Sequence, residues 1–372
     1  MRLAERVRKI QASGIRRIFD MAATLETPVN LSIGQPHFDV PEAAKEAAIR
    51  AIRDGKNNYT PAPGIPLLRE KISAWFHRRG IDHEAVMVTA GASGALTLSI
   101  MSLAGPGDEV LIPDPYFVSY KQLAITAGAE PVTYDTYPNF VPNPEIIAEK
   151  ITARTAAIIV NSPNNPTGAV WPEDVVTNIA KTAEKHGVAV ISDEVYDCFY
   201  YDEKPFSPGK VCRNVITINA LSKSASMTGW RLGFACGPAE VINEMVKLQQ
   251  FTFVNAPQPV QWAACEVLDA DVSDKREAYR RKRDLVCDNL KDRYTLTHPE
   301  GAFYVFPEVP AKGMNSTDFC LKAVEKNLLI VPGASFSEKD THFRISYAVP
   351  DETLLRGAAI LNELAAELAG EC

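Results

Sequence analysis

Short apolar runs alternate with helical patterns between residues 85 and 237. The runs are apolar throughout their length, as strands buried on both faces of a sheet are. Helical periodicity separates them, for example over residues 173–186. This alternation is typical of βαβ units and predicts an α/β fold, a mostly parallel sheet sandwiched by helices. The predicted strands are 85–89, 109–112, 156–160, 188–192, 215–218 and 232–235.

The pattern changes after about residue 273. Residues 274–292 are charged with helical spacing, which predicts a solvated linking helix; a nucleic-acid role for their basic run is disfavoured by the interleaved acids. Three apolar runs (301–307, 328–333 and 343–350) then precede an amphipathic helix from residue 351. We therefore predict a large domain and a small α+β domain. The large domain covers residues 40–280, and the small one covers residues 1–39 and 281–372.

Length and charge agree with this division. A chain of 372 residues exceeds the usual size of one hydrophobic core. Its first twenty residues are basic, but Glu5, Asp20 and the following apolar periodicity favour an ordinary N-terminal helix over a transit peptide. No apolar run approaches a membrane span, so no membrane partner is expected. The net charge of -7 is spread along the chain, which predicts no nucleic-acid partner.

The cysteines and histidines indicate neither a disulfide framework nor a metal site. The seven cysteines are odd in number, scattered and without a C-x-x-C pair, which fits buried thiols in a reducing cytoplasm. The six histidines show no metal-ligand spacing. We expect a cytoplasmic protein without a metal.

Polar loops follow four of the predicted strands, where open α/β sheets bind ligands. Taken singly, each loop is a common turn, a helix cap or a surface lysine. Their order on successive strands instead predicts one shared crevice. The loops read AGASGAL from residue 90, NSPNNPTG from 161, DEVY from 193 and NALSKSASMTGWR from 219.

These loops belong to a longer series of motifs in one order. The series resembles the class I aminotransferases, the fold-type I enzymes that use pyridoxal phosphate, and it spans residues 31 to 348. The motifs are LSIGQPHFDVP (31–41), YTPAPGIPLLRE (59–70), AGASGAL (90–96), PDPYFVSY (113–120), NSPNNPTG (161–168), DEVY (193–196), SKSASMTGWRLG (222–233), GAFYVFP (301–307), VPGASF (331–336) and FRISYA (343–348).

The resemblance implies roles around the cofactor ring. Lys223 occupies the position of the lysine that carries pyridoxal phosphate as a Schiff base. Asp193 matches the carboxylate that keeps the pyridine nitrogen protonated, and Tyr196 and Asn165 match the pair that binds the ring hydroxyl oxygen. Phe117 falls where an aromatic ring stacks on the cofactor; a core phenylalanine is its alternative interpretation.

The resemblance also implies anion-binding residues. The phosphate site would comprise Gly91, Ala92, Ser93 and Arg231, and Ser222 is a further cofactor-binding candidate. Tyr59 matches a tyrosine that reaches the phosphate of the neighbouring subunit, which implies a homodimer with shared active sites. Arg344 matches the arginine that binds the α-carboxylate of the substrate, and Gly34 and Asn165 are the other expected substrate-binding residues.

The implied activity is amino transfer between an L-amino acid and a 2-oxo acid, through alternating pyridoxal and pyridoxamine forms of the cofactor. The resemblance points to a broad, aromatic or aspartate-like specificity. Two departures from the family pattern are visible. Ala220 stands where a serine or threonine often binds the phosphate, and Ser93 stands where the aspartate-preferring bacterial branch commonly has a lysine. Strict aspartate specificity is therefore not expected.

Two alternatives stay open at this stage. A carbon–sulfur β-lyase keeps the same cofactor residues and differs in the fate of the substrate carbanion. A non-catalytic regulator that binds pyridoxal phosphate would carry an extra DNA-binding domain, for which the roughly thirty residues before the first motif are too few.

Overall fold

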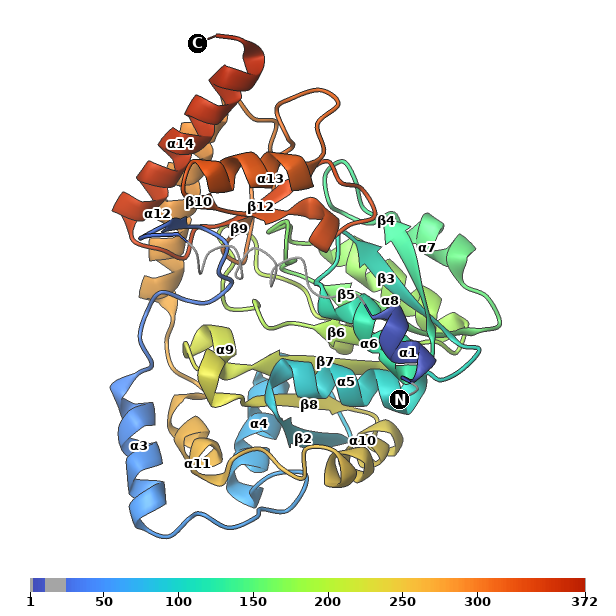
Figure 1. The fold of residues 1–372 in the computed structure, drawn as a ribbon. Coiled ribbons are helices and arrows are strands. Elements are labelled where there is room, and N and C mark those ends of the chain that lie inside the picture. The colour runs from blue at the N-terminus through green and yellow to red at the C-terminus, as the bar shows by residue number, and fades with distance from the viewer. Residues whose placement is uncertain (1–2, 11–24, 372) are drawn as a thin grey trace.

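The computed structural model describes residues 3–10 and 25–371 and has the predicted α/β architecture (Figure 1). Its main sheet has seven strands in the order β2-β8-β7-β6-β5-β3-β4. Strand β8 is antiparallel to β2 and β7, and the other neighbours pair in parallel. The strands are β2 (Ala85–Thr89), β3 (Glu109–Asp114), β4 (Glu130–Asp135), β5 (Thr155–Asn161), β6 (Ala189–Asp193), β7 (Val215–Ala220) and β8 (Gly233–Gly237).

Six of these strands were predicted, and β4 was not. Strand β4 pairs only with β3 and lies at the edge of the sheet. Its sequence EPVTYD is correspondingly polar, and its side chains are mostly half-buried or exposed. An edge strand needs no continuous apolar run, so the criterion that found the buried strands missed it.

Helices cover both faces of the sheet. Helices α5, α6 and α10 pack with the sheet in one apolar cluster, α7 and α8 in a second, and α3, α4 and α11 in a third. Their bounds are α3 (Glu42–Arg53), α4 (Pro66–Arg78), α5 (Gly91–Leu103), α6 (Ser119–Ala127), α7 (Pro144–Lys150), α8 (Glu173–Lys185), α10 (Ala239–Phe251) and α11 (Gln258–Val267). Helix α9 (Leu221–Ser224) and the 3-10 turns η1 (Pro208–Lys210) and η2 (Thr228–Trp230) lie in the connections.

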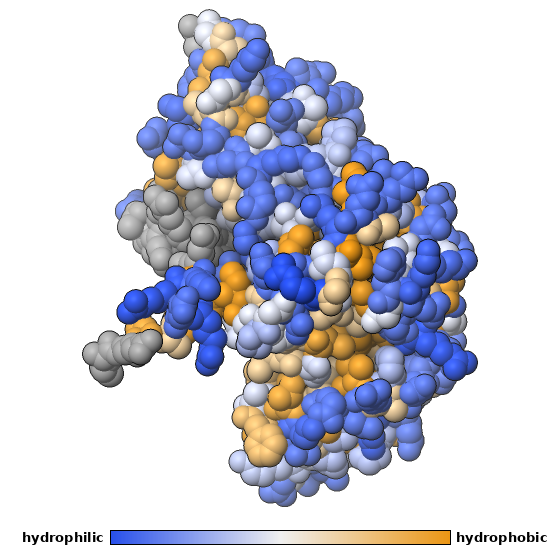
Figure 2. Space-filling model, turned by 90° about the vertical axis from the view of Figure 1, so that its right-hand side faces the viewer, coloured by the Kyte–Doolittle hydropathy of each residue, from blue (hydrophilic) through white to orange (hydrophobic). Residues whose placement is uncertain are grey.

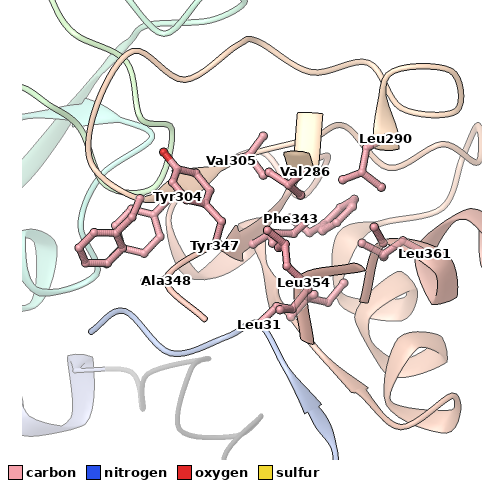
Figure 3. Packing of buried hydrophobic residues seen from close by; sticks show 14 of the residues in the cluster. Leu31, Val286, Leu290, Tyr304, Val305, Phe343, Tyr347, Ala348, Leu354 and Leu361 are labelled. Carbon is pink, nitrogen blue, oxygen red and sulfur yellow. The ribbon is translucent and has the colours of Figure 1, made fainter. Parts of the chain in front are cut away.

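A second, smaller region is built from both ends of the chain. Its three-stranded antiparallel sheet has the order β11-β12-β9, and β1 pairs in parallel with β10. Figure 3 shows its core, where Leu31 from the N-terminal part packs beside Leu354 and Phe343. The elements are β1 (Val29–Asn30), α12 (Ser273–Leu290), β9 (Tyr304–Val305), α13 (Ser316–Glu325), β10 (Leu328–Leu329), β11 (Val331–Pro332), η3 (Gly333–Ser335), β12 (Phe343–Ser346) and α14 (Asp351–Ala369). The domain boundaries at residues 39 and 280 stay a prediction, and α12 runs through the second.

Helix α12 corrects one expectation. The helix was predicted, but it is not solvated all round. Its buried residues recur every three or four positions, which is the spacing of one helix face, and this face includes two charged side chains. The buried residues are Tyr279, Lys282, Arg283, Val286, Cys287 and Leu290.

The N-terminal part of the described chain contains one short helix, and the surface is largely hydrophilic in one view (Figure 2). Helix α1 (Glu5–Lys9) lies within the predicted N-terminal helix; residues 3, 4 and 10 beside it are not helical, and the remainder of the predicted helix falls outside the described residues. Hydrophilic side chains cover much of the face in Figure 2, with apolar ones gathered in its lower half. Among the described helices, none is both long enough and apolar enough to cross a bilayer.

Candidate active site

The predicted loops meet in a cavity of about 330 Å³ beyond the carboxyl ends of β5, β6 and β7. The segment 32–35 and strands β9 and β12 of the smaller region complete its wall. Of the predicted site residues, those that line the cavity are Gly34, Ala92, Ser93, Phe117, Asn165, Asp193, Tyr196, Ser222, Lys223, Arg231 and Arg344.

Two predicted residues are not in this lining. Gly91 lies just behind it, against the side chain of Arg231. Tyr59 is 83% exposed and takes no part in the cavity of a single chain. The structure therefore brings together the predicted residues except Tyr59.

Lys223 lies in α9, directly after β7 ends at Ala220. Its amine donates a hydrogen bond to the carbonyl oxygen of Gly34 at 2.6 Å, and no ion pair of the described residues includes it. Burial, followed by the nearby charge of Arg344, lowers the pKa of Lys223 to about 8. A larger share of the amine is therefore neutral, and nucleophilic, at neutral pH than in an exposed lysine.

Asp193 ends strand β6 and is buried. Its Oδ2 accepts a hydrogen bond from the Tyr120 hydroxyl at 2.7 Å. Burial raises the pKa of Asp193 to about 6, although the bond from Tyr120 acts in the opposite direction. At pH 7 the group is mainly a carboxylate, which is able to pair with a cationic ring nitrogen of a ligand.

An anion cradle lies at the N-terminus of α5, a helix of 13 residues. The first backbone N–H groups of a helix lack partners within it and favour negative charge. A Cβ on Gly91 would approach Nη2 of Arg231 to 2.7 Å, and a Cβ on Gly233 would approach the Ala92 nitrogen to 2.6 Å. Glycine at position 91 therefore lets the arginine lie close against this helix end, and glycine at position 233 lets the start of β8 approach the same backbone.

Arg344 on β12 is a buried cation, only 2% exposed. It donates to Oδ1 of Asn165 at 3.0 Å and to the Ser32 carbonyl at 2.7 Å, while its Nε has no partner in the described structure. No carboxylate of the described residues neutralises it. Burying an unpaired charge is costly, so this guanidinium is suited to receive a carboxylate from a ligand.

Two functional candidates were not singled out from the sequence. Tyr120 holds Asp193, and Tyr304 hydrogen-bonds Tyr196 at 2.8 Å. Both tyrosines lie inside the motifs PDPYFVSY and GAFYVFP, so the motifs contained them. Their hydrogen-bond partners are distant in the sequence, and no local pattern identifies those partners.

Comparison with known proteins agrees with this geometry. The family model for aminotransferase class I and II matches residues 26–361. A probable aspartate aminotransferase of Methanocaldococcus jannaschii is 39% identical, over 97% of this chain and 99% of the relative. The aromatic-amino-acid aminotransferase 2 of Thermococcus litoralis is 37% identical, over 95% of this chain and 96% of the relative.

A solved structure gives the same result. A tetra mutant of the Thermus thermophilus aspartate aminotransferase, complexed with tryptophan, superposes with a TM-score of 0.95 at 37% identity. The match covers 98% of this chain and 100% of the other. The chain therefore belongs to the class I and II aminotransferases, a family of enzymes that depend on pyridoxal phosphate.

Proposed function

We propose that the cavity binds pyridoxal phosphate through Lys223 and transfers amino groups between L-amino acids and 2-oxo acids. The observation that carries the proposal is the surroundings of Lys223. Its amine shares one cavity with the carboxylate of Asp193, the anion cradle at Arg231 and the unpaired guanidinium of Arg344. Amine, carboxylate and two anion sites are what a phosphorylated pyridine aldehyde and an amino acid require together.

The residues fit the cofactor in detail. Arg231, Ser93, Ser222 and the amides of Gly91 and Ala92 would hold the phosphate, and the close Gly91–Arg231 contact supports this site. Asp193 would bind the pyridine nitrogen. Tyr196 and Asn165 would bind the ring oxygen, and Phe117 would lie against the ring face. Bound pyridoxal phosphate supplies an aldehyde that condenses with amines and a ring that accepts electron density from the substrate Cα.

The chain supplies orientation and a base. Arg344 would bind the α-carboxylate of the amino acid in a bidentate pair, beside Gly34, and this fixes the position of Cα. Lys223 would take up the proton at Cα. Its lowered pKa, about 8, suits a group that gains and loses a proton near neutral pH.

The specificity we propose is broad, aromatic or aspartate-like. The relatives named above act, by their names, on aspartate or on aromatic amino acids. Ser93 provides a hydroxyl rather than a cation in the cavity lining, so strict selection of a second carboxylate is not part of the proposal.

We further propose a cytoplasmic homodimer with shared active sites. Tyr59 and Phe251 are 83% and 84% exposed, which is unusual for large aromatic and apolar side chains and fits a surface covered by a second copy. The Tyr59 hydroxyl would then reach the phosphate site of the partner. Six cysteines of the described chain are free thiols, in keeping with a reducing compartment.

One half-reaction tests the activity. The purified protein, loaded with pyridoxal phosphate, is mixed with single L-amino acids without an acceptor, and the cofactor absorbance is followed. Conversion to the pyridoxamine band supports the proposal, and the fastest amino acid identifies the donor class. Release of ammonia and pyruvate from cystathionine or cysteine, with the original band persisting, would instead indicate a carbon–sulfur β-lyase.

A further inference from the structure

Four side chains in the cavity wall form a closed ring of contacts. Arg344 donates to Asn165 at 3.0 Å, and the Asn165 amide lies 3.5 Å from the Tyr196 hydroxyl. That hydroxyl lies 2.8 Å from the Tyr304 hydroxyl. The guanidinium of Arg344 closes the ring, since it lies 4.5 Å from the centre of the Tyr304 ring. Tyr304 therefore contacts both the proposed carboxylate site and the proposed ring-oxygen site.

The position of Tyr304 is firmly held. It lies on β9, is fully buried, and pairs with Ser346 of β12. Figure 3 shows it with Tyr347 at one end of the apolar cluster of the smaller region, opposite Leu290 and Leu361. Its hydroxyl is thus carried by a packed core rather than by a loop.

Either hydroxyl could donate the hydrogen bond between Tyr196 and Tyr304. Each hydroxyl has one proton to donate and can accept two hydrogen bonds. Among the described residues, Tyr196 is the hydrogen-bond partner of the Tyr304 hydroxyl. If Tyr304 donates to Tyr196, the proton of Tyr196 stays free for a ligand. The hydrogen bond from Tyr304 to Tyr196 then strengthens the hydrogen bond from Tyr196 to that ligand.

The same hydroxyl constrains the segment that holds Lys223. A Cβ on Gly34 would lie 2.6 Å from the Tyr304 hydroxyl oxygen, but 3.4 Å from the nearest ring carbon. The first distance is a clash and the second is close to ordinary contact. The carbonyl of Gly34 accepts the hydrogen bond from Lys223 at 2.6 Å. The hydroxyl of Tyr304 therefore leaves room only for glycine at the position whose carbonyl accepts the hydrogen bond from Lys223.

We propose that Tyr304 is a positioning residue for the reaction. Its hydroxyl donates to Tyr196 and so directs the Tyr196 proton to the ring oxygen of the cofactor, and the same hydroxyl restricts position 34 to glycine. The first part rests on the proposed function. The second part depends only on the fold.

The first part is tested with Tyr304→Phe, which keeps the ring under Arg344 and removes the hydroxyl. The measurement is the pH midpoint of the absorbance change of bound pyridoxal phosphate. A hydrogen bond to the ring oxygen stabilises its anionic form, so weakening that bond should raise the midpoint by about half a pH unit. The KM for the amino acid should stay within about twofold, since the ring under Arg344 remains.

Tyr347→Phe is the matched control. Tyr347 is also buried and also donates to a tyrosine hydroxyl, that of Tyr201 at 3.1 Å, but neither residue lines the cavity. The control should leave the midpoint unchanged. An unchanged midpoint in Tyr304→Phe, or the same shift in both variants, would overturn the directing role.

The second part is tested in the apoenzyme by a double-mutant cycle of thermal denaturation. Gly34→Ala alone should lower the Tm by several degrees, because the methyl group meets the hydroxyl oxygen. In the Tyr304→Phe background, Gly34→Ala should lower the Tm by much less. Additive effects, or failure of Gly34→Ala to fold in both backgrounds, would overturn the constraint on position 34.

The two tests separate the inference from the function. The cycle needs no cofactor, so it reports on the contact whatever the protein catalyses. If the wild-type protein bound no pyridoxal phosphate, the proposed function and the directing role would fall together, while a non-additive cycle would still support the constraint on Gly34.

Discussion

Two regions of this molecule each hold a lysine and an arginine that are buried or half-buried, and the charges have different partners in the two regions. On α12, Lys282 and Arg283 are 8% and 5% exposed. Lys282 binds the carboxylate of Asp351 and the Val349 carbonyl, and Arg283 binds Asp202 and Asp284 at 3.2 and 2.8 Å. In the cavity, Lys223 and Arg344 have no such counter-ion among the described residues.

The difference separates structural charges from functional ones. A buried charge that is matched within the chain contributes to holding elements together. A buried charge that is left unmatched is a cost to the folded chain, which a ligand of opposite charge relieves. Substitutions in the two regions should therefore affect different quantities: stability on α12, and activity in the cavity.

The largest contrast is expected between the two lysines. Lys223→Met should reduce turnover by at least about a thousandfold, because the proposed base at Cα is lost. The apoenzyme should be at least as stable as the wild type, since an amine with a lowered pKa is replaced by an apolar group. Steady-state kinetics and chemical denaturation of the apoenzyme measure both.

Lys282→Met is the matched change on α12. It should keep turnover within about twofold and lower the free energy of unfolding by about 1 kcal/mol, because the partner Asp351 is mostly solvated. If Lys223→Met kept substantial turnover, or if both variants lost it equally, the contrast between the regions would not hold.

The two arginines should show the same contrast more weakly. Arg344→Gln removes two charge-assisted bonds to the substrate carboxylate, worth about 3 kcal/mol together, so kcat/KM should fall about a hundredfold. Its unfolding free energy should change by less than about 1 kcal/mol, because no ion pair within the described chain is broken.

Arg283→Gln should do the opposite. It leaves Asp202 and Asp284 without their partner and should lower the unfolding free energy by about 2 kcal/mol, a value reduced by the partial exposure of both acids. Its kcat/KM should stay near that of the wild type. A greater loss of stability in Arg344→Gln than in Arg283→Gln would contradict the assignment of Arg344 to the ligand.

The sequence predicted one of these regions much better than the other. Lys223, Asp193 and Asn165 follow buried parallel strands, whose apolar runs are visible locally and whose ends must meet at one edge of the sheet. Lys282 and Arg283 were predicted to lie on a solvated helix, because a charged residue in a helical pattern is usually exposed. Their burial depends on partners at positions 202 and 351, which no local pattern reveals.

The same limit applies inside the cavity. Tyr304 contacts Tyr196 and Gly34, and the three residues come from three distant segments of the chain. The sequence alone identified GAFYVFP as an apolar strand-like run, and a tyrosine in such a run is usually a core residue. Only the packing of the smaller region against the main sheet shows that the Tyr304 hydroxyl also contacts Tyr196 and Gly34. Strand β4 was missed for a related reason, because an edge strand can be polar.

The pH dependence of apoenzyme stability should distinguish Lys223 from Lys282. The folded pKa, about 8, lies below the ordinary value of 10.5, so the unfolded chain binds more protons between these pH values. The contribution of Lys223 to stability is therefore unfavourable below pH 8 and improves as the pH rises toward 10.5. Lys223→Met should remove this rise in apoenzyme stability, and Lys282→Met should not. Denaturation curves at pH 7, 8 and 9 measure it, and parallel profiles in the three proteins would argue against a strongly buried amine at Lys223.

The smallest predicted effect concerns Asp193, which is buried without an ion pair among the described residues and is held by the Tyr120 hydroxyl at 2.7 Å. Burial raises the folded pKa to about 6 from 3.8, so the folded state binds more protons between these values, and its stability falls as the pH rises through them. Because the bond from Tyr120 lowers this pKa, Tyr120→Phe should raise it by about half a unit. The apoenzyme of the variant should then lose affinity for pyridoxal phosphate at a higher pH than the wild type. Titration of both proteins between pH 5 and 8 measures the difference directly, since the protonation of the cofactor itself is common to both. Coincident titrations would show that the hydroxyl of Tyr120 does not control the charge of Asp193.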